Sequence, residues 1–181
     1  SVYSGGLWVR SSLDTRLQGL TTTALRDGLM RYHAGKGWKE PINTLKASDG
    51  DLMSQLASSN ISTDYRDWQI AVVTARSATA ATIGFASKKE GRLFGAPNAL
   101  KVGDIIAVSP AGGDTYNLRT IPEVGGAMLV QNPHNGRIMA MQGGFDYRIS
   151  SFNRATQAMR QPGSTIKPFV YATALDKGMT P

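Results

Sequence analysis

Apolar residues recur at steps of three and four between residues 14 and 35, and this spacing predicts an α-helix with one apolar face. Asp14 is placed to cap the start of the helix, and the glycines at 35 and 37 are placed to end it. The β-prone residues 5–11 come before the helix and predict a strand. We expect the apolar face of the helix to be buried in a core. Its members are Leu17, Leu20, Ala24, Leu25, Leu29 and Tyr32.

From residue 65 the apolar period changes to two, which is typical of strands with one buried face. Five short β-prone segments, separated by glycine, proline or polar residues, predict a small antiparallel β-barrel. The segments are 68–73, 80–85, 91–94, 104–108 and 115–119. The OB-fold is a five-stranded, partly open barrel of this size. Trp68, Phe85 and Phe94 have the spacing of core residues, and a short helix is expected before the strands, near Asp51.

Two apolar runs, 127–130 and 137–141, flank the turn-forming residues 132–136 and predict a β-hairpin. The runs are almost continuously apolar, which is typical of strands that are buried on both faces of a sheet. A last apolar helical face predicts a helix that packs against the rest of the domain. Its members are Ile166, Phe169, Val170, Ala174 and Leu175.

Interruptions in these patterns divide the chain into three parts. Helix-breaking residues at 37–41 follow the first helix, and a glycine- and proline-containing stretch at 121–126 follows the last barrel strand. We therefore predict an α+β architecture in which a barrel domain, 38–120, is inserted between an opening strand and helix, 1–37, and a hairpin and helix, 121–181.

Composition and charge limit the functions that this chain can have. With 181 residues, 41% of them hydrophobic, it is long and apolar enough to form a core. The net charge of +7 favours anionic partners, but the basic residues are scattered, so no nucleic-acid partner is expected. The chain has no cysteine, and its two histidines, His33 and His134, lie far apart, so we expect no metal and no cofactor. No run approaches the roughly 20 apolar residues that span a bilayer.

The candidate chemistry is a Ser-x-x-Lys motif at Ser164 and Lys167. A serine hydroxyl becomes a good nucleophile when a neighbouring base takes its proton. Residues three apart on a helix lie on one face, and Pro168 favours a 3₁₀ first turn that brings them more nearly into line. Gly163 allows a sharp turn into the helix, whose free N–H groups suit a developing oxyanion. The competing interpretation is a plain helix start with a solvated lysine.

The surrounding sequence is more specific than the motif. Residues 152–171 read FNRATQAMRQPGSTIKPFVY and closely resemble the active-serine segment of class A penicillin-binding proteins. Residues 100–106 resemble the start of a late strand in the OB-like insert of that family, and 127–141 resembles the first hairpin of its transpeptidase sheet. Asn153, Arg154 and Gln157 match polar positions that we expect to fix the loop under the serine by hydrogen bonds.

The family signature combines Ser-x-x-Lys with Ser-Asp-Asn and Lys-Thr-Gly. Only the first element occurs here, and the chain ends at Pro181, so we expect it to be a piece of a longer protein. The resemblance implies an OB-like barrel inserted into the N-terminal strand, helix and hairpin portion of a serine transpeptidase, or β-lactamase-like, fold. Without the other motifs, the piece itself is expected to be inactive or nearly so.

The resemblance also implies a function. The parent would be a bifunctional peptidoglycan synthase on the periplasmic side of the bacterial inner membrane, with its glycosyltransferase domain and N-terminal membrane anchor outside this chain. Ser164 would attack a D-alanyl-D-alanine stem peptide, and Lys167 would accept its proton. The implied partners are stem peptides, the lipid-linked precursor, β-lactam antibiotics and protein regulators that bind the OB-like domain.

Two alternatives stay open from the sequence. A β-lactamase or a β-lactam sensor shares the Ser-x-x-Lys motif, although the context at 152–171 and the OB-like barrel argue against both. A non-catalytic interaction module would use the barrel to bind a regulator or glycan, with the serine helix as a relic. Binding by residues 40–120 alone would support the second alternative.

Overall fold

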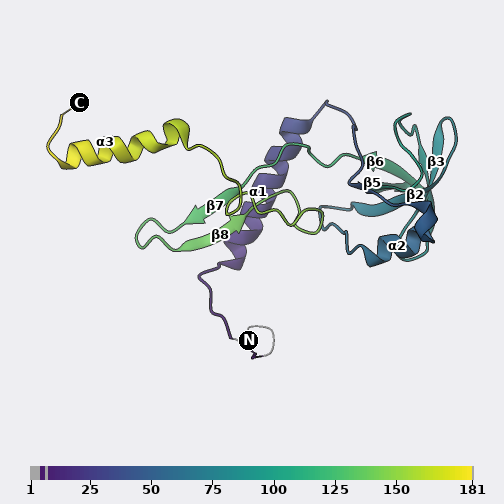
Figure 1. Ribbon diagram of the computed structural model, residues 1–181, viewed down its shortest axis with the longest axis horizontal. Coiled ribbons are helices and arrows are strands. Elements are labelled where there is room, and N and C mark those ends of the chain that lie inside the picture. The colour runs from purple at the N-terminus through teal and green to yellow at the C-terminus, as the bar shows by residue number, and fades with distance from the viewer. Residues whose placement is uncertain (1–4, 7, 181) are drawn as a thin grey trace.

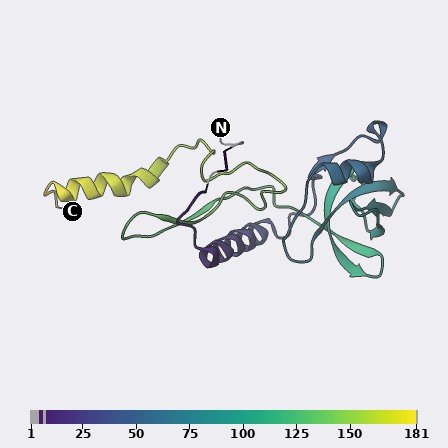
Figure 2. The ribbon, with the colours of Figure 1, turned by 90° about the horizontal axis from the view of Figure 1, so that it is seen from below.

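The computed structural model describes residues 5, 6 and 8–180. A β-barrel lies at one end of an elongated chain, a helix and a two-stranded hairpin lie in the middle, and the last helix projects at the other end (Figures 1 and 2). The elements are α1 (Thr15–His33), β1 (Asn43–Thr44), the 3₁₀ helix η1 (Ala47–Asp49), α2 (Leu52–Ser58), β2 (Gln69–Arg76), β3 (Ala80–Gly84), β4 (Glu90–Phe94), β5 (Asp104–Gly112), β6 (Thr115–Arg119), β7 (Met128–Gln131), β8 (Ile138–Gln142), the 3₁₀ helix η2 (Gly163–Ile166) and α3 (Lys167–Asp176).

Strands β2 to β6 form a closed barrel, in agreement with the five segments predicted to form one. Neighbouring strands follow the order β5-β2-β3-β4-β6, and a further pairing between β5 and β6 closes the ring. The prediction of an entirely antiparallel barrel is wrong for one pair, because β4 and β6 are parallel. An odd number of strands cannot alternate in direction all the way around a ring, so a closed five-stranded barrel needs at least one parallel pair.

Successive residues of a strand point to opposite faces of a sheet, so every second residue of the barrel strands points into the barrel interior. Phe85 is buried in this interior, as predicted, with its ring centroid 4.9 Å from that of Tyr116. Trp68 is also buried, as predicted, but in a second core outside the barrel interior. The prediction for Phe94 is wrong, because 65% of its surface is exposed while its neighbour Leu93 is fully buried. The inward position on β4 belongs to Leu93, so the next residue must face outward.

This alternation gives a matched pair of substitutions on one strand. Leu93→Ala is expected to lower the free energy of unfolding by about 2–5 kcal/mol, because it leaves a cavity inside the barrel. Phe94→Ala removes an exposed side chain and should change it by less than about 0.5 kcal/mol. Urea denaturation of both variants measures the difference. Equal losses would contradict the burial of Leu93.

Helix α2 covers one side of the barrel, and its start agrees with the prediction. The Asp51 carboxylate accepts a hydrogen bond from the backbone N–H of Ser54 at 2.9 Å and caps the helix. Leu52 and Leu56 pack against Val72 of β2 and against β5. Lys88, in the turn between β3 and β4, pairs with Asp51, so the cap also ties that turn to the helix.

Helix α1 has the predicted bounds, but its buried face differs from the predicted one. The Asp14 carboxylate caps it by accepting from the N–H of Leu17 at 2.9 Å. Leu29 is buried, but Leu20 and Tyr32 are 58% and 63% exposed and Ala24 is exposed too, so the predicted burial is wrong for these three. The helix docks on β8 partly through a polar side chain, because both amide atoms of Gln18 bond the Met141 backbone at 3.0 Å.

The hairpin of β7 and β8 is confirmed, but its predicted burial is wrong. Ala140 is buried, while Met128, Leu129 and Ile138 are 39–45% exposed. Within the described residues, α1 is the one helix in extensive contact with this hairpin, so no second helix covers its other face.

The predicted strand at 5–11 is not formed by the described residues of that segment, and Leu7 lies outside them. The chain reaches the start of β8 only at Ser12 and Asp14, which donate to the carbonyls of Ile138 and Met139 at 2.6 and 2.9 Å. Residues 8–11 therefore lie beyond the start of β8 and have no strand to pair with among the described residues.

Candidate functional site

The Ser-x-x-Lys motif lies at a 3₁₀-to-α junction, as predicted. Ser164 is in η2, Lys167 is the first residue of α3, and the backbone N–H of Lys167 donates to the Ser164 carbonyl. Gly163 has a φ of +53°, a left-handed conformation that glycine adopts readily, and this turns the chain into η2. Pro168 lies in the first turn of α3, where its missing N–H breaks no helical hydrogen bond.

The 3₁₀ turn places Ser164 and Lys167 on the same side of the chain, because residues three apart nearly eclipse in this geometry. Both side chains are exposed to solvent. Among the described residues, no side-chain hydrogen bond joins the serine hydroxyl to the lysine amine. The backbone therefore supplies the spacing of the pair, while nothing in this segment encloses it.

Helix α3 does not pack, which contradicts the prediction for its apolar face. Phe169, Val170 and Leu175 are exposed, and the helix lies at the opposite end of the chain from the barrel (Figure 1). The apolar face has the predicted residues, but no part of the described chain lies against it. An amphipathic helix gains most of its stability from such packing, so this face is incomplete as it stands.

The loop that leads to the serine is held by hydrogen bonds within itself and to Met141 and Gly143. The side chains of Asn153 and Gln157 take part, as predicted, whereas Arg154 takes part through its backbone N–H. The Asn153 N–H donates to Gln157 Oε1 at 2.6 Å, and the Arg154 N–H donates to the Gly143 carbonyl at 2.9 Å. A Cβ at Gly143 would lie 2.0 Å from Asn153 Oδ1, and one at Gly125 would lie 1.8 Å from Arg154 Nε. Both glycines are needed because side chains of this loop pack on their backbones.

A buried charged junction joins three separate segments and was not predicted. Arg26 of α1 pairs with Asp146, after β8, at 3.3 Å and with Asp64, before β2, at 2.8 Å. Its Nε also donates to the Phe145 carbonyl at 2.7 Å. Arg148 pairs with the other oxygen of Asp64 at 3.0 Å. These residues are far apart in sequence and follow no period, so no local pattern points to their contact.

An aromatic cluster lies beside this junction. The Tyr65 ring meets the Trp68 and Phe145 rings edge-on, with ring centroids 4.9 and 5.0 Å apart. Leu29 of α1 and Ala107 of β5 are buried in the same cluster. The barrel, α1 and the segment after the hairpin therefore share one apolar core, with the charged junction at its edge.

The electrostatics of Asp64 give a pH prediction. Partial burial raises the pKa of Asp64, but hydrogen bonds and charge from Arg26 and Arg148 outweigh it, so the pKa lies below its ordinary value. A lowered carboxylate pKa stabilises the fold above the unfolded pKa of about 3.9, and this stability is lost as pH falls through the folded pKa.

We therefore expect acid to destabilise the wild type more than Asp64→Asn between about pH 5 and pH 2. The measurement is the free energy of unfolding of each protein in urea across this range. Asp67→Asn, which removes an exposed carboxylate in the same loop, is the matched control for the loss of one negative charge. The wild-type pH dependence in Asp64→Asn would contradict the ion pairs of Asp64.

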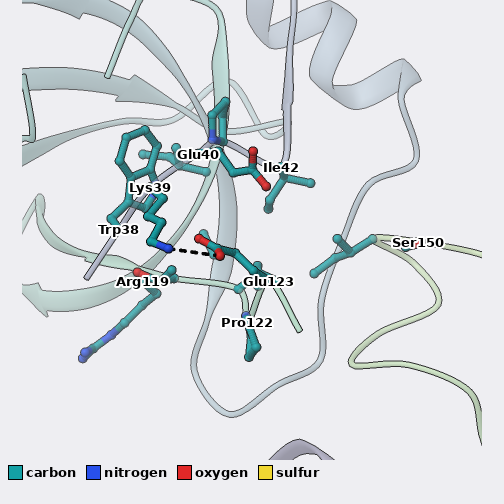
Figure 3. Close-up of a pocket in the computed structure, with 14 residues that line it drawn as sticks. Trp38, Lys39, Glu40, Ile42, Arg119, Pro122, Glu123 and Ser150 are labelled. Atoms are coloured by element: carbon teal, nitrogen blue, oxygen red, sulfur yellow. Dashed lines mark hydrogen bonds and ion pairs between the residues drawn. The ribbon is translucent and has the colours of Figure 1, made fainter. Parts of the chain in front are cut away.

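A pocket of about 350 Å³ lies where the chain enters and leaves the barrel (Figure 3). The incoming segment 38–42 and the outgoing segment 119–123 line it together, and Lys39 pairs with Glu123 across it at 3.3 Å. Glu40 and Arg119 add charges of both signs, which gives no single ligand class. The pocket thus marks the two connections between the barrel and the rest of the chain.

The two histidines are not part of a reactive cluster. His33 is buried at the end of α1, where Nε2 lies 3.3 Å from the Gly37 carbonyl, and His134 is exposed in the hairpin turn. No group of three or more His, Cys, Asp or Glu side chains placed to hold a metal ion occurs in the part of the chain that the structure describes. Over the same residues, no helix has the length and apolar character needed to cross a membrane.

Comparisons with known proteins agree with this arrangement. Residues 126–181 match the family of the penicillin-binding protein transpeptidase domain. Penicillin-binding protein 1A of Rickettsia typhi is 39% identical over 99% of the chain, and the Escherichia coli protein of that name is 32% identical over 99%. The crystal structure of penicillin-binding protein 1A from Haemophilus influenzae matches 94% of the chain with a TM-score of 0.64 and 30% identity.

The coverage of these relatives is partial. The chain spans 24% of the Rickettsia typhi and Escherichia coli proteins and 27% of the Haemophilus influenzae chain. Within that span the agreement is nearly end to end, and it includes the barrel as well as the segment with Ser164. The chain therefore belongs to the class A penicillin-binding proteins, as a penicillin-binding protein 1A-like segment.

Proposed function

We propose that this chain is part of a peptidoglycan synthase and supplies the nucleophile of its D,D-transpeptidase, which acts through a serine acyl-enzyme. The observation that carries the proposal is the placement of Ser164 and Lys167 on one 3₁₀-to-α turn, inside the segment that matches the transpeptidase family. A plain helix start does not need a left-handed glycine followed by a 3₁₀ turn.

In the proposed reaction Ser164 Oγ attacks the penultimate carbonyl of a D-alanyl-D-alanine stem peptide, and its proton passes to Lys167. The backbone N–H of Ser164, at the start of η2, is the local donor for the oxyanion that forms. D-Alanine leaves with a proton, and the amine of a second stem peptide then displaces the serine from the acyl group. β-Lactams would acylate the same oxygen and so act as inhibitors.

The rest of the synthase lies outside this chain in our proposal. It comprises the Ser-Asp-Asn and Lys-Thr-Gly motifs, a glycosyltransferase domain that uses the lipid-linked precursor, and an N-terminal anchor that holds the protein on the periplasmic side of the inner membrane. The exposed Ser164, Lys167 and α3 support this view, because a working transpeptidase needs walls around its serine. By itself the segment would then be inactive or nearly so.

We assign the barrel to an OB-like domain at 38–120, between transpeptidase parts at 1–37 and 121–181. The closed ring of five strands with one parallel pair supports this assignment, and all of its strands lie between residues 69 and 119. A domain that contributes no residue to the Ser-x-x-Lys turn is free to contact other proteins, so we propose that regulators bind there.

The test of this function is the position of a penicillin adduct. The full-length synthase is incubated with a penicillin, digested with trypsin and analysed by mass spectrometry. Trypsin cuts after Arg160 but not between Lys167 and Pro168, so Ser164 falls in the peptide 161–177. An adduct on Ser164 is expected. A folded protein with no adduct would favour the non-catalytic interaction module, and an adduct that hydrolyses rapidly would favour a β-lactamase.

A further inference from the structure

We propose that Asp146, with the side chains bonded to it, is a positioning residue for Ser164 that couples the barrel to the nucleophile segment. The inference rests on the proposed acyl-enzyme function. It concerns the buried charged junction, whose hydrogen bonds and ion pairs include none to the Ser-x-x-Lys turn. Its effect on the reaction would therefore be transmitted through the chain that joins Asp146 to Ser164.

The Asp146 carboxylate is bonded both to the segment that leads into the barrel and to helix α1. Its carboxylate oxygen Oδ2 accepts from the Thr63 hydroxyl at 2.9 Å and the Asp64 N–H at 3.4 Å, both in the segment that leads into the barrel. The same oxygen pairs with Arg26 of α1 at 3.3 Å. The other oxygen accepts from the Arg148 N–H at 3.0 Å. One carboxylate thus links three segments.

Solvent offers this carboxylate no replacement for a partner that it loses. The Asp146 side chain is fully buried and that of Arg26 is 10% exposed, so water cannot replace a lost contact cheaply. A buried charge that loses a hydrogen-bond partner carries a large desolvation cost. The geometry around Asp146 is therefore stiff, and a displacement of the barrel segment would move the carboxylate with it.

The chain that follows Asp146 connects it to the serine. The Asp146 carbonyl accepts from the N–H groups of Ile149 and Ser150 at 3.2 and 3.0 Å, which closes a tight turn. The next residues form the hydrogen-bonded loop around Asn153, and Arg154 packs on Gly125, just after the barrel. The chain from Asp146 to this loop is thus fixed at each end, and the exposed residues 158–162 connect the loop to η2 and Ser164.

Thr63 allows a test from the barrel side of the junction. Thr63→Val keeps the shape of the side chain but removes the hydroxyl that donates to Asp146, whereas Thr63→Ser keeps that donor. In the full-length synthase we expect the acylation rate constant of Ser164 at saturating fluorescent penicillin to fall about fivefold in Thr63→Val. Thr63→Ser should restore most of the rate. Thr115→Val removes a hydroxyl bonded to the Gly112 carbonyl on the far β5–β6 turn and should have no effect.

The measurement separates positioning from simple loss of stability. Each variant is assayed at a temperature where thermal unfolding shows it to be fully folded, and the rate at saturation is distinguished from binding of the penicillin. Asp146→Asn serves as a second variant and is expected to slow acylation more than Thr63→Val. Wild-type acylation rates in every variant that folds would overturn the proposal. A wild-type protein that is not acylated on Ser164 would instead refute the proposed function.

Discussion

Replacing Ser164 with alanine in the full-length synthase is expected to abolish covalent labelling by penicillin and all cross-linking. In the proposed mechanism the acyl-enzyme forms on the serine oxygen, and alanine offers no atom in its place. Removal of a nucleophile typically costs about a millionfold in rate, which leaves no measurable turnover. Labelling with a fluorescent penicillin on a denaturing gel measures the first effect, and analysis of cross-linked muropeptides measures the second.

Thr165→Ala is the matched control for this experiment. Thr165 carries the neighbouring hydroxyl in the same 3₁₀ turn, so its loss perturbs the backbone as much as that of Ser164. This control should be labelled at close to the wild-type rate. Labelling that survives in Ser164→Ala and vanishes in Thr165→Ala would move the nucleophile to the next residue.

Lys167→Ala is expected to slow acylation by about 10²–10⁴-fold, the usual contribution of a positioned general base. Lys167→Arg should be slowed similarly, because arginine keeps the positive charge but cannot give up its proton to act as a base. The rate of acylation by a chromogenic β-lactam gives both values. Comparison of the two variants separates proton transfer from simple attraction of the substrate carboxylate.

Lys177, at the end of α3, offers a control for the loss of a lysine from this segment. Lys177→Ala should acylate at the wild-type rate. If Lys167→Arg retained most of the activity, charge rather than proton acceptance would be the role of this residue. Another group would then have to take the proton from Ser164.

The helices and strands could be predicted from the sequence better than the burial and packing of their side chains. The strand segments were found because alternation along a strand depends on its own residues. The 3₁₀ turn at Ser164 was found because Gly163 permits a left-handed turn and Pro168 restricts the backbone that follows. Phe94 was misassigned because adjacent apolar residues on a strand leave its inward side undecided, and only Leu93 points into the barrel. The inward side of a strand is set by the partners across the sheet.

The missed features depend on contacts between distant segments. The pairing of Arg26 with Asp146 joins residues 120 positions apart, and neither belongs to a recognisable motif. The predicted packing of α3 failed for a related reason. An apolar face shows that a helix has something to bury, but it does not show whether the covering element is present in the same stretch of chain.

The insertion of the barrel between α1 and the hairpin has a consequence for the order of folding. The contact between Gln18 and Met141 closes a loop of 123 residues, because the whole barrel lies between them. A folded barrel holds its two ends together at Lys39 and Glu123, so the effective loop shrinks to about 40 residues and its closure costs about 1 kcal/mol less entropy. A barrel that folds first would therefore speed the docking of α1 on the hairpin. If the barrel misfolds, the docking of α1 on β8 has to close the longer loop.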